Sequence, residues 1–514
     1  MRSARSFIVL TLLLIQSSLI SGQSSDSILR KRYSFSFSNN TLVEMIDSIR
    51  VKTNLGFSYN PNYLSQQNKF SYSFRHYPLR AILDSIFKSS NLSYNLIGTT
   101  IAISKNISTE KPLPVVNGTH RNDSVNYLHY NGSVKDALNN DPIPFASIYI
   151  KNKPIGTISN QDGYFSLKVP KELSSDSVCF SFLGYRTKTL AASDLHTEDN
   201  EIRLTQMSIR LKEVTIRYIK PDELIQKAIE RIPDNYSSTA QLATGFYRET
   251  IKQNNEYVAL TEAVLKIYKA PYDSYLTDQA TIYKGRKSPF VKPMDTIFFK
   301  LQGGIYTSFM LDIAKNHSSF ISGDNFYQYD YKLEGTSTYQ GHTLYIIAFD
   351  QKDNIQYPLY KGKIYIDTES LALVKLTFSL SPKGIDYAAN VMVKKAPVGV
   401  KVRPMDASYE VGYTEQNNIW HLSHIREDIK FKIRKRFNLF NITFQSTAEL
   451  AITQIDSVEA KRFKRDQTIK EKDIFTEKIT SYDPDFWEDF NYIAPEKKLE
   501  EAIDELREKT AKIE

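Results

Sequence analysis

The chain has 514 residues and a formal net charge of +8 at neutral pH. This length corresponds to two to four domains, and the excess of 33 Tyr and 28 Phe over 2 Trp favours β-structure. The single cysteine, Cys179, excludes an internal disulfide; it lies in a strand-like run, where we expect a buried small hydrophobic residue.

Residues 1–22 have the pattern of a secretory signal peptide. Arg2 and Arg5 precede an apolar run over residues 7–15, and small residues follow, which predicts cleavage near Ser21–Gln23. No cysteine follows the apolar run, so we do not expect a lipoprotein. No later apolar run is long enough to span a bilayer as a helix. The pattern therefore predicts an exported protein that is periplasmic or associated with the outer membrane.

Residues 33–104 contain two copies of a strand–helix–strand unit. The segment Thr41–Ile49 aligns with Pro78–Ile86, and both have apolar residues at helical spacing. Together with Phe35 and Phe37, this pattern resembles the secretin and TonB-receptor short N-terminal domain. The resemblance implies a periplasmic protein-interaction module, which in TonB-dependent receptors can relay a signal to an anti-sigma regulator.

Residues 129–205 alternate between apolar and polar positions in short runs, with turn residues between them. This pattern predicts a small antiparallel β-sandwich, and Asp162-Gly163 predicts a hairpin turn. The motifs Asp141–Ala146, Gly156–Phe165 and Ser181–Tyr185 resemble those of the carboxypeptidase regulatory-like (transthyretin-like) domain. The resemblance implies a non-catalytic binding or spacer module.

Residues 105–128 contain prolines, a glycine and several small polar residues without apolar periodicity, which predicts a linker. A signal peptide followed by these two modules also opens many Bacteroidota TonB-dependent transporters, so the order resembles a Bacteroidota-like envelope protein. Those transporters continue into a plug and a barrel of about 22 strands. The remaining segment of about 310 residues is too short for that, which excludes a full transporter.

Residues 219–460 alternate over longer runs and predict an antiparallel curved-sheet domain, with a helix over Pro221–Ile232. The strand–turn–strand segment Lys361–Leu376 resembles a hairpin of outer-membrane lipoprotein carriers and anti-sigma-regulator sensors. That resemblance implies a sheet whose apolar face can hold acyl chains; the alternative is a plain curved sheet with a filled core. Residues 461–514 predict a tail with an aromatic cluster and a helix, packed back onto the sheet.

The densest basic run extends from Arg426 to Arg436. Lys430, Lys432 and Arg434 alternate with apolar residues, which predicts one strand with a basic outer face. Such a face is either simply solvated or in contact with anionic lipid or lipopolysaccharide. Nucleic acid is not an expected partner of an exported protein.

The sequence offers no catalytic, cofactor-binding or metal site. His424 and Glu427 match half of a zinc carboxypeptidase motif, but no histidine follows. His421 and His424 would share a helix face, yet the alternation indicates a strand, where positions three apart face opposite ways. Asp483 and Asp485 flank a proline, which favours a turn over a glycosidase pair.

We therefore expect a mainly β multidomain protein with an α+β N-terminal module, a β-sandwich, and a large antiparallel β-rich domain with flanking helices. The first functional hypothesis is a non-enzymatic exported cell-envelope protein, an accessory or sensor without a cofactor. Its partner would be an envelope or outer-membrane protein, including a TonB-linked one, bound at sheet edges. The second is a lipid or glycolipid carrier with an apolar pocket in the curved sheet, and the third is an unrecognised hydrolase.

Overall fold

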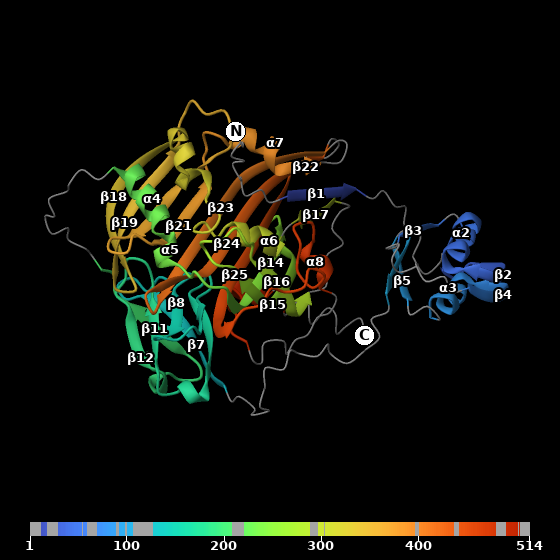
Figure 1. The fold of residues 1–514 in the computed structure, drawn as a ribbon, viewed down its shortest axis with the longest axis horizontal. Helices are drawn as coiled ribbons and strands as arrows, with labels where there is room; N and C mark the ends of the chain where they lie inside the picture. Colours follow the sequence, from blue (N-terminus) through green and yellow to red (C-terminus); the bar gives the residue numbers. More distant parts are fainter. Residues whose placement is uncertain are drawn as a thin grey trace. The chain divides into compact units, whose positions relative to one another are not determined.

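The protein is described by a computed structural model, in which the chain divides into two compact units (Figure 1). One unit comprises residues 18–124, and the other comprises residues 1–17 and 125–514. The fold is mainly β, as predicted. The structure describes residues 12–17, 29–53, 55–58, 69–88, 92–97, 100–105, 127–207, 220–287, 297–302, 304–395, 400–435, 441–479, 490–501 and 503.

The smaller unit contains both predicted helices, each preceded and followed by a strand. Strands β2 and β4 pair antiparallel, and β3, β6 and β5 form a second sheet. The apolar residues at helical spacing are buried in one core, as the repeat predicts. The elements are β2 (Arg32–Thr41), α2 (Leu42–Thr53), β3 (Gly56–Ser58), β4 (Lys69–Pro78), α3 (Leu79–Lys88), β5 (Leu92–Ile97) and β6 (Thr100–Lys105).

In the larger unit, residues 127–204 form a sandwich of two small sheets around one apolar core. One sheet has the order β10-β7-β13, and the other has the order β12-β11-β8-β9. The strands are β7 (Tyr127–Asp136), β8 (Ser147–Ile150), β9 (Gly156–Ile158), β10 (Tyr164–Pro170), β11 (Ser177–Ser181), β12 (Lys188–Ala191) and β13 (Asn200–Leu204). Cys179 is buried in β11, as predicted.

The predicted turn at Asp162-Gly163 is present, and Gly163 has the positive φ of 75° that favours glycine. The predicted hairpin is wrong, however. The flanking strands β9 and β10 belong to different sheets, so the turn carries the chain across the sandwich. Asn160 closes it, because its Oδ1 accepts the backbone N–H groups of Asp162 and Tyr164, each at 2.9 Å.

The C-terminal half forms one ten-stranded antiparallel sheet, ordered β16-β15-β14-β25-β24-β23-β21-β20-β19-β18. The predicted hairpin near residue 365 is the antiparallel pair of β20 and β21. The strands are β14 (Gln241–Gln253), β15 (Glu256–Lys269), β16 (Gln279–Lys287), β18 (Tyr329–Tyr339), β19 (His342–Gln351), β20 (Tyr360–Asp367), β21 (Leu373–Leu380), β23 (Val400–Gln416), β24 (Ile419–Lys435) and β25 (Ile442–Glu459).

One face of this sheet is apolar and is filled by side chains. Phe320 from a 3₁₀ turn stacks on Phe349 with ring centroids 4.4 Å apart, and the helices α4 and α6 add further apolar residues. The predicted helix at Pro221 ends at Glu230, and a second short helix follows, because Pro233 lacks the N–H needed for continuation. The covering elements are α4 (Pro221–Glu230), α5 (Ile232–Asn235), α6 (Gly304–Met310), η4 (Ser319–Ile321) and η5 (Gly323–Gln328).

Smaller elements complete this unit. Leu12–Ser17 forms strand β1, which pairs with β17 and β22. The others are η2 (Lys171–Leu173), η3 (Ala192–Asp194), β17 (Ile297–Gln302), η6 (Ile385–Tyr387), α7 (Ala388–Met392), β22 (Val393–Lys395) and α8 (Phe475–Lys478). Within the described parts of the chain, no helix is both long and apolar enough to cross a membrane.

Candidate binding cleft

The second face of the ten-stranded sheet is polar and carries a row of alternating charges. Because side chains alternate between faces, register decides which outward residues become neighbours. Arg248 on β14 lies opposite Glu262 on β15 and Glu449 on β25, and the row continues to both sides. We call these six residues the charge row: Arg286, Glu262, Arg248, Glu449, Arg426 and Glu410.

Ion pairs neutralise the charge row internally. Glu262 accepts from the Nε atoms of Arg248 at 2.7 Å and of Arg286 at 2.6 Å. Glu449 accepts from Arg248 Nη1 at 3.4 Å and from Arg426 Nη1 at 2.5 Å. Burial alone would raise the pKa of Glu262, but the two guanidiniums outweigh it and hold that pKa below its usual value. The carboxylate of Glu262 is therefore charged, and its two oxygens are each bonded to an arginine of the row.

The end of the row is held by a lysine and a histidine. Glu410 contacts Lys375 Nζ at 2.7 Å and His424 Nε2 at 3.1 Å. Burial opposes ionisation of Glu410, but these two neighbours hold its pKa well below the usual range. The ring of Phe145, from the sandwich, lies 5.0 Å from the guanidinium carbon of Arg426.

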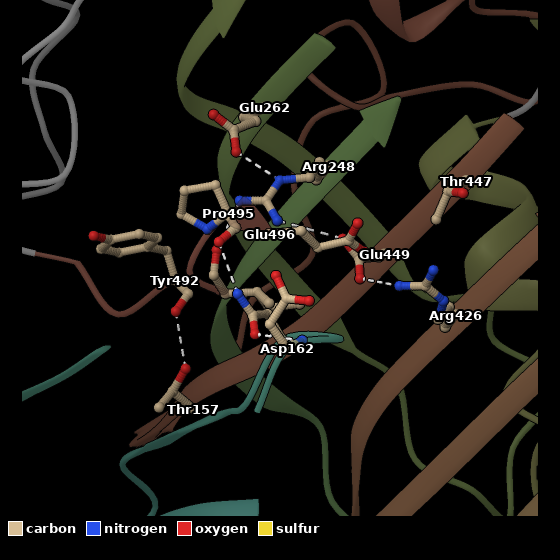
Figure 2. A network of polar contacts seen from close by, with 12 residues as sticks. Thr157, Asp162, Arg248, Glu262, Arg426, Thr447, Glu449, Tyr492, Pro495 and Glu496 are labelled. Atoms are coloured by element: carbon tan, nitrogen blue, oxygen red, sulfur yellow. Dashed lines mark hydrogen bonds and ion pairs between the residues drawn. The ribbon is translucent and has the colours of Figure 1, made fainter. Parts of the chain in front are cut away.

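Residues 490–499, which we call the C-terminal strap, join the sandwich to this polar face (Figure 2). From the sheet, Arg248 Nη2 donates to the carbonyl of Ile493 at 2.7 Å. From the sandwich, Thr157 Oγ1 donates to the carbonyl of Tyr492 at 2.9 Å, and Asp162 Oδ2 accepts the N–H of Lys497 at 2.8 Å. The strap thus fixes the sandwich on the sheet.

Apolar contacts reinforce the strap. Ile493 is buried in a small cluster with Phe246 and Val264 of the sheet and Ile158 of the sandwich. Tyr492 packs against the same cluster, which confirms the predicted packing of tail aromatics on the sheet. The rest of the predicted aromatic cluster, residues 483–489, lies outside the described residues.

A cleft remains between the sandwich, the strap and the sheet. It consists of a larger hollow of 720 Å³ and a smaller one of 580 Å³, which share Gln161, Ser408, Arg426 and Asp428. Both volumes lie in the range of small-ligand sites. The larger hollow is lined by polar and charged side chains with Tyr164 and Tyr257, and the smaller one includes Phe145.

Four lysines line the larger hollow without an ion pair among the described residues. We call them the rim lysines: Lys252, Lys430, Lys497 and Lys498. Lys252 lies 4.3 Å from the ring centre of Tyr257, and the other three are exposed. The same lining also includes the carboxylates Asp162, Asp406 and Glu496, so the rim lysines leave the larger hollow with a small excess of positive charge, which attracts anionic groups.

The residues of the half-matched zinc motif do not come together. His424 contacts Glu410 on the polar face, whereas Glu427 accepts from Ser308 Oγ of α6, on the apolar side, at 2.9 Å. Burial lowers the pKa of His421 to about 4. Among the described residues, no group of three His, Cys, Asp or Glu could hold a metal ion. Asp483 and Asp485 lie outside the described residues.

Sequence reasoning missed the charge row and the cleft. The alternation shows that Arg248, Glu262 and Glu449 each face outward from a strand, but it does not show that the strands are neighbours. A weak signal did exist for two of them: Glu262 and Glu449 each interrupt a mostly apolar stretch of their strands. A charge at such a position needs a partner, and that partner could have been sought.

Comparison with known families supports one of the predicted resemblances. The CarboxypepD_reg-like domain matches residues 130–216, which confirms the nature of the sandwich. No finding supports the predicted secretin or TonB-receptor domain at residues 33–104 or a Bacteroidota origin, and both stay predictions. Comparison with curated proteins gives no match.

Three solved structures resemble part of the chain only distantly. A lipovitellin structure, on lipid–protein interactions, shares 8% identity over 47% of this chain, with a TM-score of 0.23. This chain covers only 27% of lipovitellin. A DUF1329 family protein from Desulfovibrio piger shares 12% identity over 46% of this chain and 94% of its own, with a TM-score of 0.18. A LolA superfamily protein from Nitrosomonas europaea shares 11% identity over 46% of this chain and 97% of its own, with a TM-score of 0.15. Scores this low carry no functional argument.

Proposed function

We propose that this chain is a non-enzymatic, exported cell-envelope protein that binds an acidic segment of an envelope partner in the cleft. It would act as an accessory or sensor protein. One observation carries the proposal: the rim lysines make no ion pair among the described residues, whereas the arginines of the floor are paired with carboxylates. A ligand with carboxylates would supply the missing counter-charges.

The electrostatics of the floor support binding over catalysis. A general acid or base works best with a pKa near the operating pH. The pKa values of Glu262 and Glu410 are instead held below the usual range by neighbouring cations, so neither carboxylate offers a proton near neutral pH. The hydrolase hypothesis would need a cleft group that titrates near neutral pH.

The carrier hypothesis would use the opposite, apolar face of the sheet. Described side chains pack that face, and a cavity there, lined by Tyr247, Glu249 and Glu427 among others, has a volume of only 10 Å³. An acyl chain would require α4 or α6 to move away from the sheet. Native mass spectrometry of protein purified from its own envelope tests this: a stoichiometric lipid would favour the carrier over the acidic-segment binder.

The cleft is tested with a fluorescent hexaglutamate peptide and a hexalysine peptide of the same length. We expect the full chain to bind hexaglutamate and not to bind hexalysine. The variant Lys497→Gln/Lys498→Gln should weaken binding by about tenfold, because two rim charges are lost. Lys151→Gln/Lys153→Gln, which removes two exposed charges from a sandwich turn, is the matched control. Equal binding by both variants, or no preference for hexaglutamate, would contradict the proposal.

A further inference from the structure

At one end of β23 and β24, two pairs of like charges lie directly opposite each other. Lys401 is the cross-strand partner of Arg434, and Arg403 is the partner of Lys432. All four side chains are exposed, and none lines either hollow of the cleft. We call these four residues the basic patch.

The four charges share one face of the sheet. On each strand they are two positions apart, and the intervening Ile433 of β24 is buried in the apolar core. The sequence prediction of a strand with a basic outer face is therefore confirmed for Lys432 and Arg434. In addition, the neighbouring strand β23 carries two cations, Lys401 and Arg403, directly opposite these residues.

This arrangement is locally unfavourable in the isolated protein. Like charges directly opposite each other destabilise a β-ladder. One counter-charge is nearby: Asp386 lies 2.7 Å from Arg403 Nη2, but both side chains are more than 70% exposed (71% and 76%), so water screens the pair. The other three cations make no ion pair among the described residues. A dense anionic surface would relieve their repulsion.

Exposed apolar side chains flank the basic patch. Met405 follows Arg403 on β23 and is 46% exposed, and Tyr387, the neighbour of Asp386 in η6, is 37% exposed. Cations beside exposed aromatic and apolar groups suit a bilayer interface, where the cations meet phosphates and tyrosine sits at headgroup level. A soluble polyanion would use the cations alone.

We propose that the basic patch docks the protein on an anionic phospholipid bilayer. The lysines and arginines contact lipid phosphates, and Tyr387 and Met405 enter the interface beside them. The occupant is a membrane surface because the apolar neighbours gain contacts only there. This docking surface is separate from the cleft, so either site can function when the other is lost.

The test is co-sedimentation of the full chain with vesicles. We expect binding to equimolar phosphatidylcholine and phosphatidylglycerol, weaker binding as salt is added, and none to pure phosphatidylcholine. Lys432→Gln/Arg434→Gln should lower the partition coefficient about 25-fold, since each cation near an anionic surface contributes roughly fivefold. Lys151→Gln/Lys153→Gln, with the same loss of charge elsewhere, should bind as the parent does.

Three results would overturn the docking proposal. They are absence of binding to the anionic vesicles, equal losses in the two double variants, and binding of a soluble phosphorylated oligosaccharide at the patch without binding of vesicles. Circular dichroism of each variant checks that it is folded. Hexaglutamate binding by Lys432→Gln/Arg434→Gln reports on the cleft separately, so failure of one site is not mistaken for failure of the other.

Discussion

Arg248→Met tests whether the charge row holds the larger unit together. The Arg248 side chain is 2% exposed and contacts Glu262, Glu449 and the carbonyl of Ile493. Methionine keeps most of the volume but removes every one of these polar contacts. We therefore expect both the sheet and the attachment of the C-terminal strap to weaken.

The size of the expected loss of stability depends on the ion pairs that remain in the variant. Removing one partner of a buried ion pair costs about 3–5 kcal/mol, because the other charge stays buried. Here Glu262 keeps Arg286 and Glu449 keeps Arg426, which favours the lower end of that range. The lost bond to the Ile493 carbonyl, from a charged donor, adds about 1.5 kcal/mol. We expect a total loss of about 4.5 kcal/mol in the free energy of unfolding.

Urea denaturation of the larger unit measures this loss, and amide exchange of residues 490–499 reports on the strap. The control is Arg403→Met, the same substitution in an exposed ion pair, which should cost less than about 0.5 kcal/mol. We expect faster strap exchange in Arg248→Met only. If the two variants lose equal stability, or if Arg248→Met loses less than about 1 kcal/mol, the reasoning is refuted.

Three further predictions concern single residues. Burial raises the pKa of Glu249 from 4.5 to about 7, so the folded state retains a proton that the unfolded state releases, and stability should fall as pH rises across that interval. Glu249→Gln should remove this slope and add about 3 kcal/mol at pH 8 in chemical denaturation; an unchanged slope would contradict the assignment. Asn160→Ala removes the hydrogen bond from Nδ2 to the carbonyl of Pro495. We expect a protease to cleave the strap of this variant faster than that of the parent. Cleavage at the parent rate would show that this bond is dispensable. Arg434→Gln relieves repulsion from Lys401 and should raise stability by about 0.2–1 kcal/mol in a thermal melt; a decrease would show that the pair is not repulsive.

Local patterns predicted the elements of this fold well. The period-two alternation gave the strands, and proline at residue 221 gave the start of α4. The same alternation predicted the outward face of β24, on which Lys432 and Arg434 are exposed. These features depend on residues within one or two turns of each other, so a single sequence contains the information.

Long-range register was not predictable in this way. The pairing of Arg248 with Glu449 joins residues 201 positions apart, and the strap joins Lys497 to Asp162. No local pattern says which of ten similar strands become neighbours. The crossing at Gly163 was misjudged for the same reason, because a tight turn does not reveal whether its two strands share a sheet.

The strand order has a consequence for biogenesis. β14 and β24 are both partners of β25, which is the last strand of the sheet in the chain. During synthesis from the N-terminus, a three-stranded part ending at β14 and a six-stranded part ending at β24 therefore have unpaired edges until β25 is made. Such edges are templates for pairing with other chains. A truncation before Ile442 would leave both edges permanently unpaired. We therefore expect such a truncated chain to aggregate with other chains that are still being made.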